Sequence, residues 1–209
     1  TPDITDNRSL FLNLESSYQL NSKTVLAGNT YYRNIKTGTI NGDINSNAQV
    51  NDGSAFPSAE CISQPESTSC NALLNRTRTQ QQNWGISGQA IVTDKLLGKE
   101  NEFLFGGGYD QSVADFLQTS QFGHLMSNRS VNAVSAFDDS SRVGLSGDTI
   151  TWSFFTQDTL SLTKDLHLTA SGRYNYTSIS NKDQITVYGP ESLSGKHVFD
   201  RFNPSVGLT

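Results

Sequence analysis

Short and long connections alternate along this chain between segments that have the pattern of β-strands. Short polar turns are expected at Asn21–Lys23, Lys95–Glu100 and Thr163–Asp165, and long polar connections at 36–81, 120–148 and 180–196. In an antiparallel meander, this alternation places every short turn at one rim of the sheet and every long loop at the other. Outer-membrane β-barrels have this arrangement, with their turns in the periplasm and their loops outside the cell. The pattern therefore predicts an all-β, up-and-down meander in the wall of a membrane channel or receptor.

The individual segments alternate between apolar and polar side chains with a period of two residues. In the first segment, Leu10, Leu12, Leu14, Tyr18 and Leu20 share one face, and Asn13, Glu15, Ser17 and Gln19 share the other. A half-exposed strand explains this period and a helix does not. Further strands are expected from Thr24 to about Lys36, from Asn83 to Thr93, from Glu102, on both sides of the turn at Thr163–Asp165, and from about His197. We therefore expect about seven strands, and because bacterial single-chain barrels have an even number, we expect this piece not to close by itself.

Aromatic side chains gather toward the long-loop ends of the expected strands. Trp152, Tyr174 and Tyr176 would belong to the aromatic girdle that barrels place at the membrane interface. Tyr31 and Tyr32, near the end of their expected strand, would mark the outer rim. Arg173 alternates with tyrosines and would face water while they face lipid. A soluble sheet that packs the same rings into a core is the alternative that the sequence leaves open.

The composition suits a sheet with one apolar face. Hydrophobic residues make up 34% of the chain, whereas the apolar share of soluble domains is about 45–50%. A barrel with a wet interior needs no packed centre, so a low apolar content is expected. No stretch is long and apolar enough for a transmembrane helix. The chain starts at Thr1 without a signal peptide, so we expect a fragment or mature piece. The net charge of −5 gives no basic footprint for nucleic acid.

The two cysteines, Cys61 and Cys70, lie in one polar segment within the longest connection. A disulfide between them would close a short loop, and such bridges persist in oxidising compartments such as the periplasm and the cell surface. A zinc site would need further Cys or His ligands nearby, and His124, the closest histidine, lies far off in sequence. The spacing favours an intraloop disulfide.

The last third of the chain carries a resemblance to a known family. The segment from Trp152 to Thr163 has the sequence WSFFTQDTLSLT, residues 166–174 have LHLTASGRY, and residues 202–208 have FNPSVGL. The first two resemble the barrel hairpin of TonB-dependent outer-membrane receptors, and the third resembles the strand that usually follows it. The earlier hairpins and the cysteine-bearing loop are compatible with the family but less diagnostic.

The resemblance implies a fold, a location and a function. Such receptors have a barrel of about 22 strands closed by an N-terminal plug, so residues 1–209 would be a central part of the barrel, truncated at both ends and without the plug. The whole protein would lie in the lipid of the bacterial outer membrane. It would bind a scarce small-molecule or metal-chelate ligand, most commonly an iron–siderophore complex, and import it with energy from TonB, which would act through the missing N-terminal region. A passive porin-like or adhesin-like barrel and a soluble extracellular β-sandwich remain the alternatives.

The sequence shows no catalytic constellation, so no enzyme activity and no cofactor are expected. The histidines have no Ser or Cys nucleophile in a recognisable motif, and the acids are scattered through expected loops. Ligand contact is expected instead from polar and aromatic residues at the outer rim and in the long loops, because arginine pairs with anionic groups and aromatic rings cover flat ones. The candidates are Tyr31, Arg33, Arg76, Arg78, His124, Tyr188 and Arg201.

Overall fold

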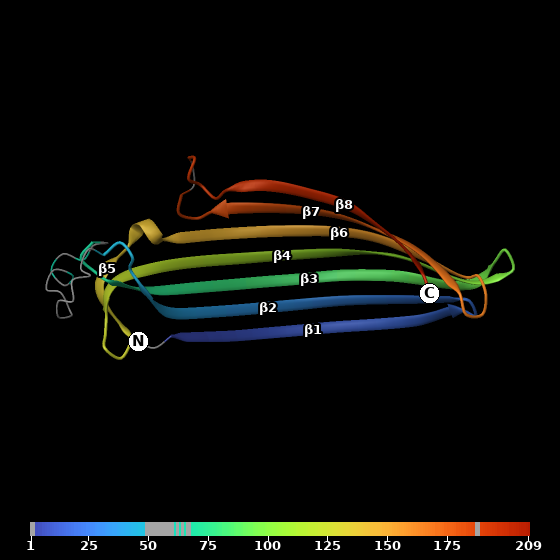
Figure 1. Ribbon diagram of the computed structural model, residues 1–209, viewed down its shortest axis with the longest axis horizontal. Coiled ribbons are helices and arrows are strands. Elements are labelled where there is room, and N and C mark those ends of the chain that lie inside the picture. Colours follow the sequence, from blue (N-terminus) through green and yellow to red (C-terminus); the bar gives the residue numbers. More distant parts are fainter. Residues whose placement is uncertain (1–2, 49–60, 62, 64, 66–67, 187–188) are drawn as a thin grey trace.

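The computed structural model describes residues 3–48, 61, 63, 65, 68–186 and 189–209, which form one antiparallel sheet (Figure 1). The elements are β1 (Ile4–Asn21), β2 (Thr24–Ile44), β3 (Ala72–Leu96), β4 (Lys99–Leu125), β5 (Val131–Phe137), the 3-10 turn η1 (Asp139–Ser141), β6 (Val143–Ser161), β7 (His167–Asp183) and β8 (Gly195–Leu208). The order across the sheet is β1-β2-β3-β4-β6-β7-β8, and β5 pairs with β4. This confirms the all-β meander. Within the described residues the edge strands β1 and β8 do not pair with each other, so the sheet is an open arc.

The short turns and the long connections lie at opposite ends of the sheet, as the sequence predicts (Figure 1). The turns β1–β2, β3–β4 and β6–β7 lie at the right of the view, and the connections β2–β3, β4–β6 and β7–β8 lie at the left. Leu97 and Gly98 form the β3–β4 turn with φ angles of 52° and 76°. Two central residues with positive φ are typical of the type I′ hairpin, whose twist matches that of the flanking strands. We name the two ends the turn end and the loop end.

The strands extend well beyond the segments that alternate in sequence. β2 continues to Ile44 and β3 begins at Ala72, so residues 37–44 and 72–81, expected as part of a long loop, are strand. Tyr31 and Tyr32 consequently lie near the middle of β2 and not at the rim. The expectation was wrong because alternation marks only strand segments with one apolar face. Where both faces meet water, the backbone ladder continues without that signal.

The connection expected at 120–148 also contains regular structure. It includes the end of β4, all of β5 and η1, and the start of β6. β5 is an additional short strand that the sequence did not predict, so the described part of the chain contributes seven long strands and one short one to the sheet. β5 pairs with the last residues of β4, from Gln121 to Leu125. It therefore folds back at the loop end and does not extend the arc.

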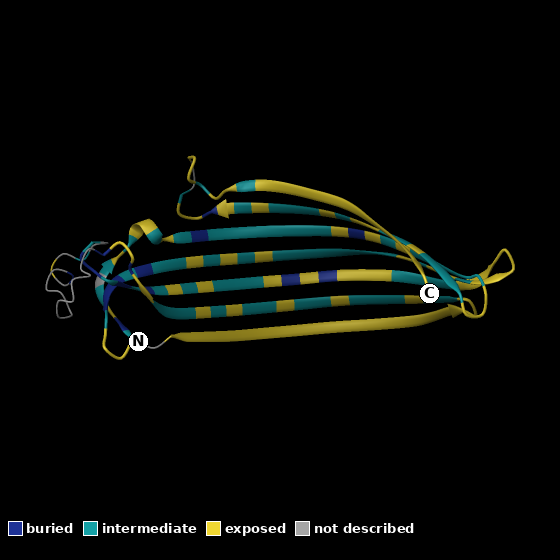
Figure 2. Cartoon of the chain, viewed as in Figure 1, coloured by how far each residue is buried: buried dark blue, intermediate teal, exposed yellow. Residues whose placement is uncertain are grey.

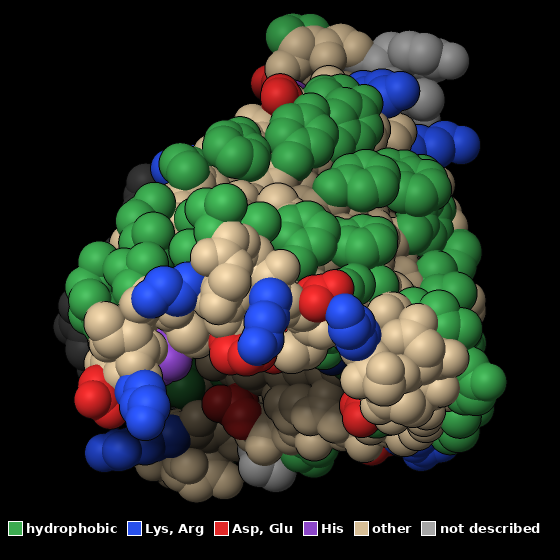
Figure 3. Space-filling view, turned by 90° about the vertical axis from the view of Figure 1, so that its right-hand side faces the viewer, with side chains coloured by type: hydrophobic (Ala, Val, Ile, Leu, Met, Phe, Trp, Pro, Cys, Tyr) green, Lys and Arg blue, Asp and Glu red, His purple; other side chains and the backbone are tan. Residues whose placement is uncertain are grey.

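The strand register divides the sheet into an apolar and a polar face. Residues paired directly across two antiparallel strands point to the same side. Leu12 pairs with Tyr32, and Tyr32 pairs with Trp84; farther along, Phe154 pairs with Tyr174. Hydrophobic side chains cover this convex face in the view from the turn end (Figure 3). The predicted apolar face is thereby confirmed, and we name it the outward face and the opposite one the inward face.

The apolar residues of the outward face have no protein layer covering them. Leu14 is 66% exposed, Phe154 59% and Val206 76%. Buried residues are confined to short stretches of the strands and to the loop end, while β1 is exposed along its whole length (Figure 2). An uncovered apolar surface of this kind requires an apolar environment. Among the described residues, the structure contains no helix that is long and hydrophobic enough to traverse a bilayer.

Candidate ligand-facing surface

Hydrogen bonds between polar side chains connect the strands of the inward face. The hydroxyl of Tyr31 donates to Asp110 Oδ1 at 2.7 Å, and the hydroxyls of Thr151 and Thr177 lie 3.0 Å apart. These positions alternate with the outward apolar residues, so they belong to the inward face. An inward wall of paired polar groups suits a water-filled interior.

An aromatic ring with an arginine beside it interrupts the polar inward wall. Phe155 lies against Gly106, where an added Cβ would be 2.6 Å from the ring's Cζ. Arg173 is the register partner of Phe155, and its guanidinium carbon is 5.7 Å from the ring centroid. Arg173 Nε also donates to Asn175 Oδ1 at 2.9 Å. The ring and the cation together offer a flat apolar surface and an anion partner.

A groove of about 490 Å³ opens on the inward face next to this ring. Its lining includes Phe155, the carboxylate of Glu15, and the amides of Asn29 and Gln89. Asn29 Nδ2 donates to Asn13 Oδ1 at 2.6 Å. The groove therefore provides hydrogen-bonding groups and one charge to a polar molecule in the interior.

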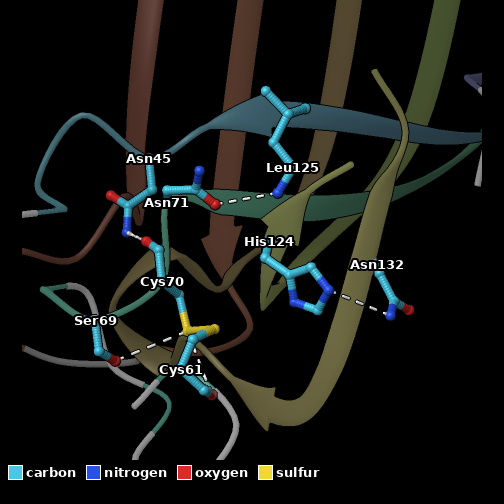
Figure 4. Close-up of a disulfide and its surroundings, with 8 residues drawn as sticks. All are labelled: Asn45, Cys61, Ser69, Cys70, Asn71, His124, Leu125 and Asn132. Atoms are coloured by element: carbon cyan, nitrogen blue, oxygen red, sulfur yellow. Dashed lines mark hydrogen bonds between the residues drawn. A yellow bond between two sulfur atoms is a disulfide. The ribbon is translucent and has the colours of Figure 1, made fainter. Parts of the chain in front are cut away.

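At the loop end, the predicted disulfide between Cys61 and Cys70 is present (Figure 4). Both cysteines are buried, and the bridge packs against Phe122 of β4. Asn45 Nδ2 donates to the carbonyl of Cys70 at 2.7 Å. Asn71 Oδ1 accepts from the backbone N–H of Leu125 at 3.1 Å. The bridge is thus connected to the ends of β2, β3 and β4.

His124 lies near this disulfide and not on an exposed rim (Figure 4). It is 4% exposed, and its Nε2 lies 3.4 Å from Asn132 Nδ2. No hydrogen-bond partner for its Nδ1 is found among the described residues. The described residues also hold no group of three His, Cys, Asp or Glu side chains that could bind a metal ion. Contact between His124 and a solute would require the loop end to open, so its role stays a prediction.

The structure does not bring the other candidate residues into one site. Arg33 shares the inward face of β2 with Tyr31, and Arg201 lies on the inward face of the edge strand β8. Arg76 and Arg78 lie in β3 on the outward face. Tyr188 is outside the described residues. Their assignment to ligand binding therefore stays a prediction, and the inward set consists of Tyr31, Arg33 and Arg201.

Sequence reasoning did not select Asp110, Phe155 or Arg173 as candidates, although all three lie on the inward face. A signal for them exists: each occupies a position that alternates with outward aromatic residues. The residues predicted from the sequence lie in expected loops and at the expected strand ends. The interior is lined by the middle of the strands. The alternation of inward and outward positions along each strand therefore predicts the residues of the inward face better than nearness to a loop does.

Asp183 organises the start of the β7–β8 connection. Its Oδ1 accepts the backbone N–H groups of Ile185 and Thr186, both at 2.8 Å, and its Oδ2 accepts that of Leu193 at 3.0 Å. These bonds, led by the one from Leu193, hold the pKa of the carboxyl below its usual range. The charged carboxylate therefore holds both ends of the β7–β8 connection together at the loop end of the sheet.

The chain shares its fold with solved structures that are named as import receptors, a siderophore receptor and a transporter. It aligns with the open form of the ferric-catecholate import receptor Fiu from E. coli K12 at a TM-score of 0.62 and 12% identity, over 99% of this chain and 33% of Fiu. The siderophore receptor PiuA from Acinetobacter baumannii aligns at 0.68 and 10%, over 99% and 30%. The ferric citrate transporter FecA aligns at 0.62 and 11%, over 99% and 25%. The chain thus spans a third or less of the length of these structures.

The family comparison covers the whole sequence. No curated protein matches the chain. The profile described as "TonB dependent receptor-like, beta-barrel" matches residues 1–209. Its extent agrees with the sheet, whose turns, loops and faces follow the barrel pattern from β1 to β8. The chain belongs to the TonB-dependent receptor-like β-barrel family.

Proposed function

We propose that this chain is part of an outer-membrane receptor that binds a scarce solute outside the cell and imports it with energy supplied through TonB. One observation carries the proposal: a single sheet has an apolar outward face and a polar inward face, and all its long connections lie at one end. Membership of a family of bacterial outer-membrane receptors supports it. The sheet provides the wall, and the loop end faces the outside.

The solute that we propose is an iron–siderophore complex. Support comes from the similar structures, which are named as a ferric-catecholate import receptor, a siderophore receptor and a ferric citrate transporter. The inward wall offers suitable contacts, because Arg173 beside Phe155 presents a cation and a ring to an anionic, partly flat chelate. Tyr31, Arg33 and Arg201 would add contacts from other strands.

We further propose that the barrel continues beyond both edges of this sheet and that a plug domain lies elsewhere in the protein. The open edges of β1 and β8 support the first part, since an unpaired edge is satisfied when a barrel closes. The coverage of a third or less of the similar structures agrees with it. Contact with TonB would then lie outside the sheet described here.

Uptake by the full-length receptor tests the proposal. Cells that lack other iron receptors are given radioactive iron bound to a catecholate, a hydroxamate or citrate, with and without TonB. We expect uptake of one chelate that disappears when TonB is absent. Uptake that persists without TonB would instead identify a passive, porin-like barrel. TonB-dependent uptake of a solute without iron would retain the receptor and reject the iron chelate.

Solubility separates the receptor from an extracellular β-sandwich. The outward face exposes large hydrophobic side chains such as Leu14 and Phe154, so the chain expressed without detergent should aggregate. A monodisperse monomer that unfolds cooperatively in buffer would support the sandwich.

A further inference from the structure

Basic side chains gather on the outward face near the loop end of β1, β2 and β3. The outward basic patch consists of Arg8, Lys36, Arg76 and Arg78. Arg8 pairs directly with Lys36, and Arg78 lies two residues along β3 from the register partner of Lys36. All four are exposed. By their parity along the strands, they share the face of Leu12, Tyr32 and Trp84 and do not point into the interior.

The outward basic patch surrounds a groove of about 460 Å³. Gly38 lies in its lining, and a Cβ added there would meet nothing within 4 Å, so the space above this residue is unfilled. Ile4 and Ile40 line the same groove beside the cations. The groove therefore combines positive charge with a small apolar surface.

The positive charge of this groove is only partly neutralised by the protein. Arg8 Nη2 lies 3.3 Å from Asp6 Oδ2, and Arg76 donates to the uncharged amide of Gln121. Among the described residues, Lys36 and Arg78 form no ion pair. Of the described residues that line the groove, Asp6 is the single carboxylate against four cations, which leaves an excess of three positive charges.

Asp115 of β4 is a carboxylate on the same outward face, at the register level of Lys36, and its Oδ1 accepts a hydrogen bond from the hydroxyl of Ser146 at 2.6 Å. Among the described residues, it forms no ion pair with a cation of the patch. The direct pairing of Arg8 with Lys36 places like charges opposite each other, which destabilises a strand pair. An anion bound between them would relieve this repulsion.

The height of the patch relative to the apolar band places it among lipid headgroups. The apolar run of the outward face on β1 extends from Leu20 to Leu10, about 34 Å along the strand and roughly 25 Å along the membrane normal for the tilt of barrel strands, which matches the apolar band of a barrel. Arg8 lies two residues beyond Leu10 toward the loop end, and Lys36 is its register partner. The cations then lie at the level of the headgroups of the outer leaflet.

We infer that the outward basic patch binds the phosphorylated headgroup of an anionic glycolipid in the outer leaflet. Arg78 and Lys36 contact phosphate oxygens, and Ile4 and Ile40 contact the adjoining apolar part of the lipid. The inference rests on the proposed function in one respect, namely that the chain lies in an outer membrane. It assigns Arg76 and Arg78 to lipid contact and not to the solute path.

The test uses the full-length receptor inserted in phosphatidylcholine nanodiscs that contain either bis-phosphorylated lipid A or its dephosphorylated form. Native mass spectrometry measures how much lipid A stays bound. The variant Lys36→Gln/Arg78→Gln removes two cations from the patch. Because each cation next to an anionic surface contributes about 1 kcal/mol, retention of the phosphorylated lipid should fall about thirtyfold. Lys182→Gln/Lys196→Gln is the matched control, since it removes two outward cations near the loop ends of β7 and β8.

Each outcome decides the inference. Loss in the patch variant alone, with preference for the phosphorylated lipid, supports it. Equal retention of both lipid forms by the unaltered receptor would overturn it, and so would equal losses in the patch and control variants. A patch variant that keeps the lipid but loses solute uptake would show that these cations serve the solute path. A gel-mobility assay of heated and unheated protein confirms barrel formation in each variant. Failure of the unaltered receptor to insert would instead count against the proposed function.

Discussion

The hydroxyl of Tyr31 on β2 reaches Asp110 on β4 by passing over β3, the strand between them. Gly85 is the register partner of both residues, so it lies directly beneath this hydrogen bond. A Cβ added to Gly85 would be 2.5 Å from Tyr31 Cε1 and 2.5 Å from Asp110 Oδ1. The absence of a side chain at Gly85 therefore permits a bond that joins three strands of the inward wall.

The variant Gly85→Ala should break this bond. The methyl group takes the space of the Tyr31 ring and of the carboxylate, so we expect a loss of about 1–2 kcal/mol from the free energy of unfolding. Gly88→Ala is the control, because its Cβ would meet only the carbonyl oxygen of Ala27 at 3.8 Å. Urea unfolding of the full-length receptor in lipid vesicles measures both. Equal stability of Gly85→Ala and the unaltered protein would show that the bond contributes nothing.

An arginine on the outward face should be costly at the height of the bilayer centre. Leu14 lies in the middle of the apolar run from Leu10 to Leu20 on β1, and an arginine near the midplane costs about 2–4 kcal/mol. Ser17→Arg, on the inward face of the same strand, should change the stability little. The same unfolding assay applies. Similar losses in both variants would contradict the assigned facing of β1.

Removal of the disulfide should loosen the loop end without disrupting the barrel. A bridge that closes a ring of about 10 residues contributes roughly 2–3 kcal/mol of local constraint. In Cys61→Ala/Cys70→Ala, we expect faster amide exchange at Asn71 and Leu125, unchanged strand content and weaker solute capture. Circular dichroism, hydrogen exchange and solute titration measure these three properties. Unaltered affinity would separate the bridge from ligand binding, and lost strand content would show that the sheet depends on it.

Protonation of Asp183 should release the β7–β8 loop. Its pKa is lowered in the folded protein by the backbone N–H groups that it accepts, so its contribution to stability is present at neutral pH and is lost as the pH falls through the lowered folded-state value. We expect amide protection at Ile185 and Leu193 to hold from about pH 7 to pH 5 and to decline below about pH 4. In Asp183→Asn the decline should be absent, with weaker protection throughout. An identical acid transition in both proteins would assign it to another group.

The sequence predicted the facing of the strands better than their lengths. Leu12 was assigned correctly to the apolar side, and Arg173 to the side opposite the tyrosines, because a sheet with one apolar side alternates strictly along each strand. The sequence of β2 beyond Lys36 shows no such alternation, because neither face of the strand needs to be apolar there. The full length of β2 was therefore not predicted. The Tyr31–Asp110 bond could not be predicted either, because it depends on which residues of three strands lie at the same level. The disulfide between Cys61 and Cys70 could be predicted, because the two cysteines lie close together in the sequence and the bridge closes only a short loop.

In the proposed receptor, the continuation of the strands beyond the apolar band would also set the distance from the membrane at which a solute first meets the protein. β4 has 27 residues, so it is about 90 Å long and rises about 70 Å along the membrane normal, whereas the apolar band of a barrel is only about 25 Å tall. In the proposed receptor, much of the sheet would consequently stand above the bilayer as a rigid, hydrogen-bonded wall. A molecule arriving from outside would be captured at the loop end, far above the lipid surface. It would then move along the inward face of the sheet before it reached the level of the membrane.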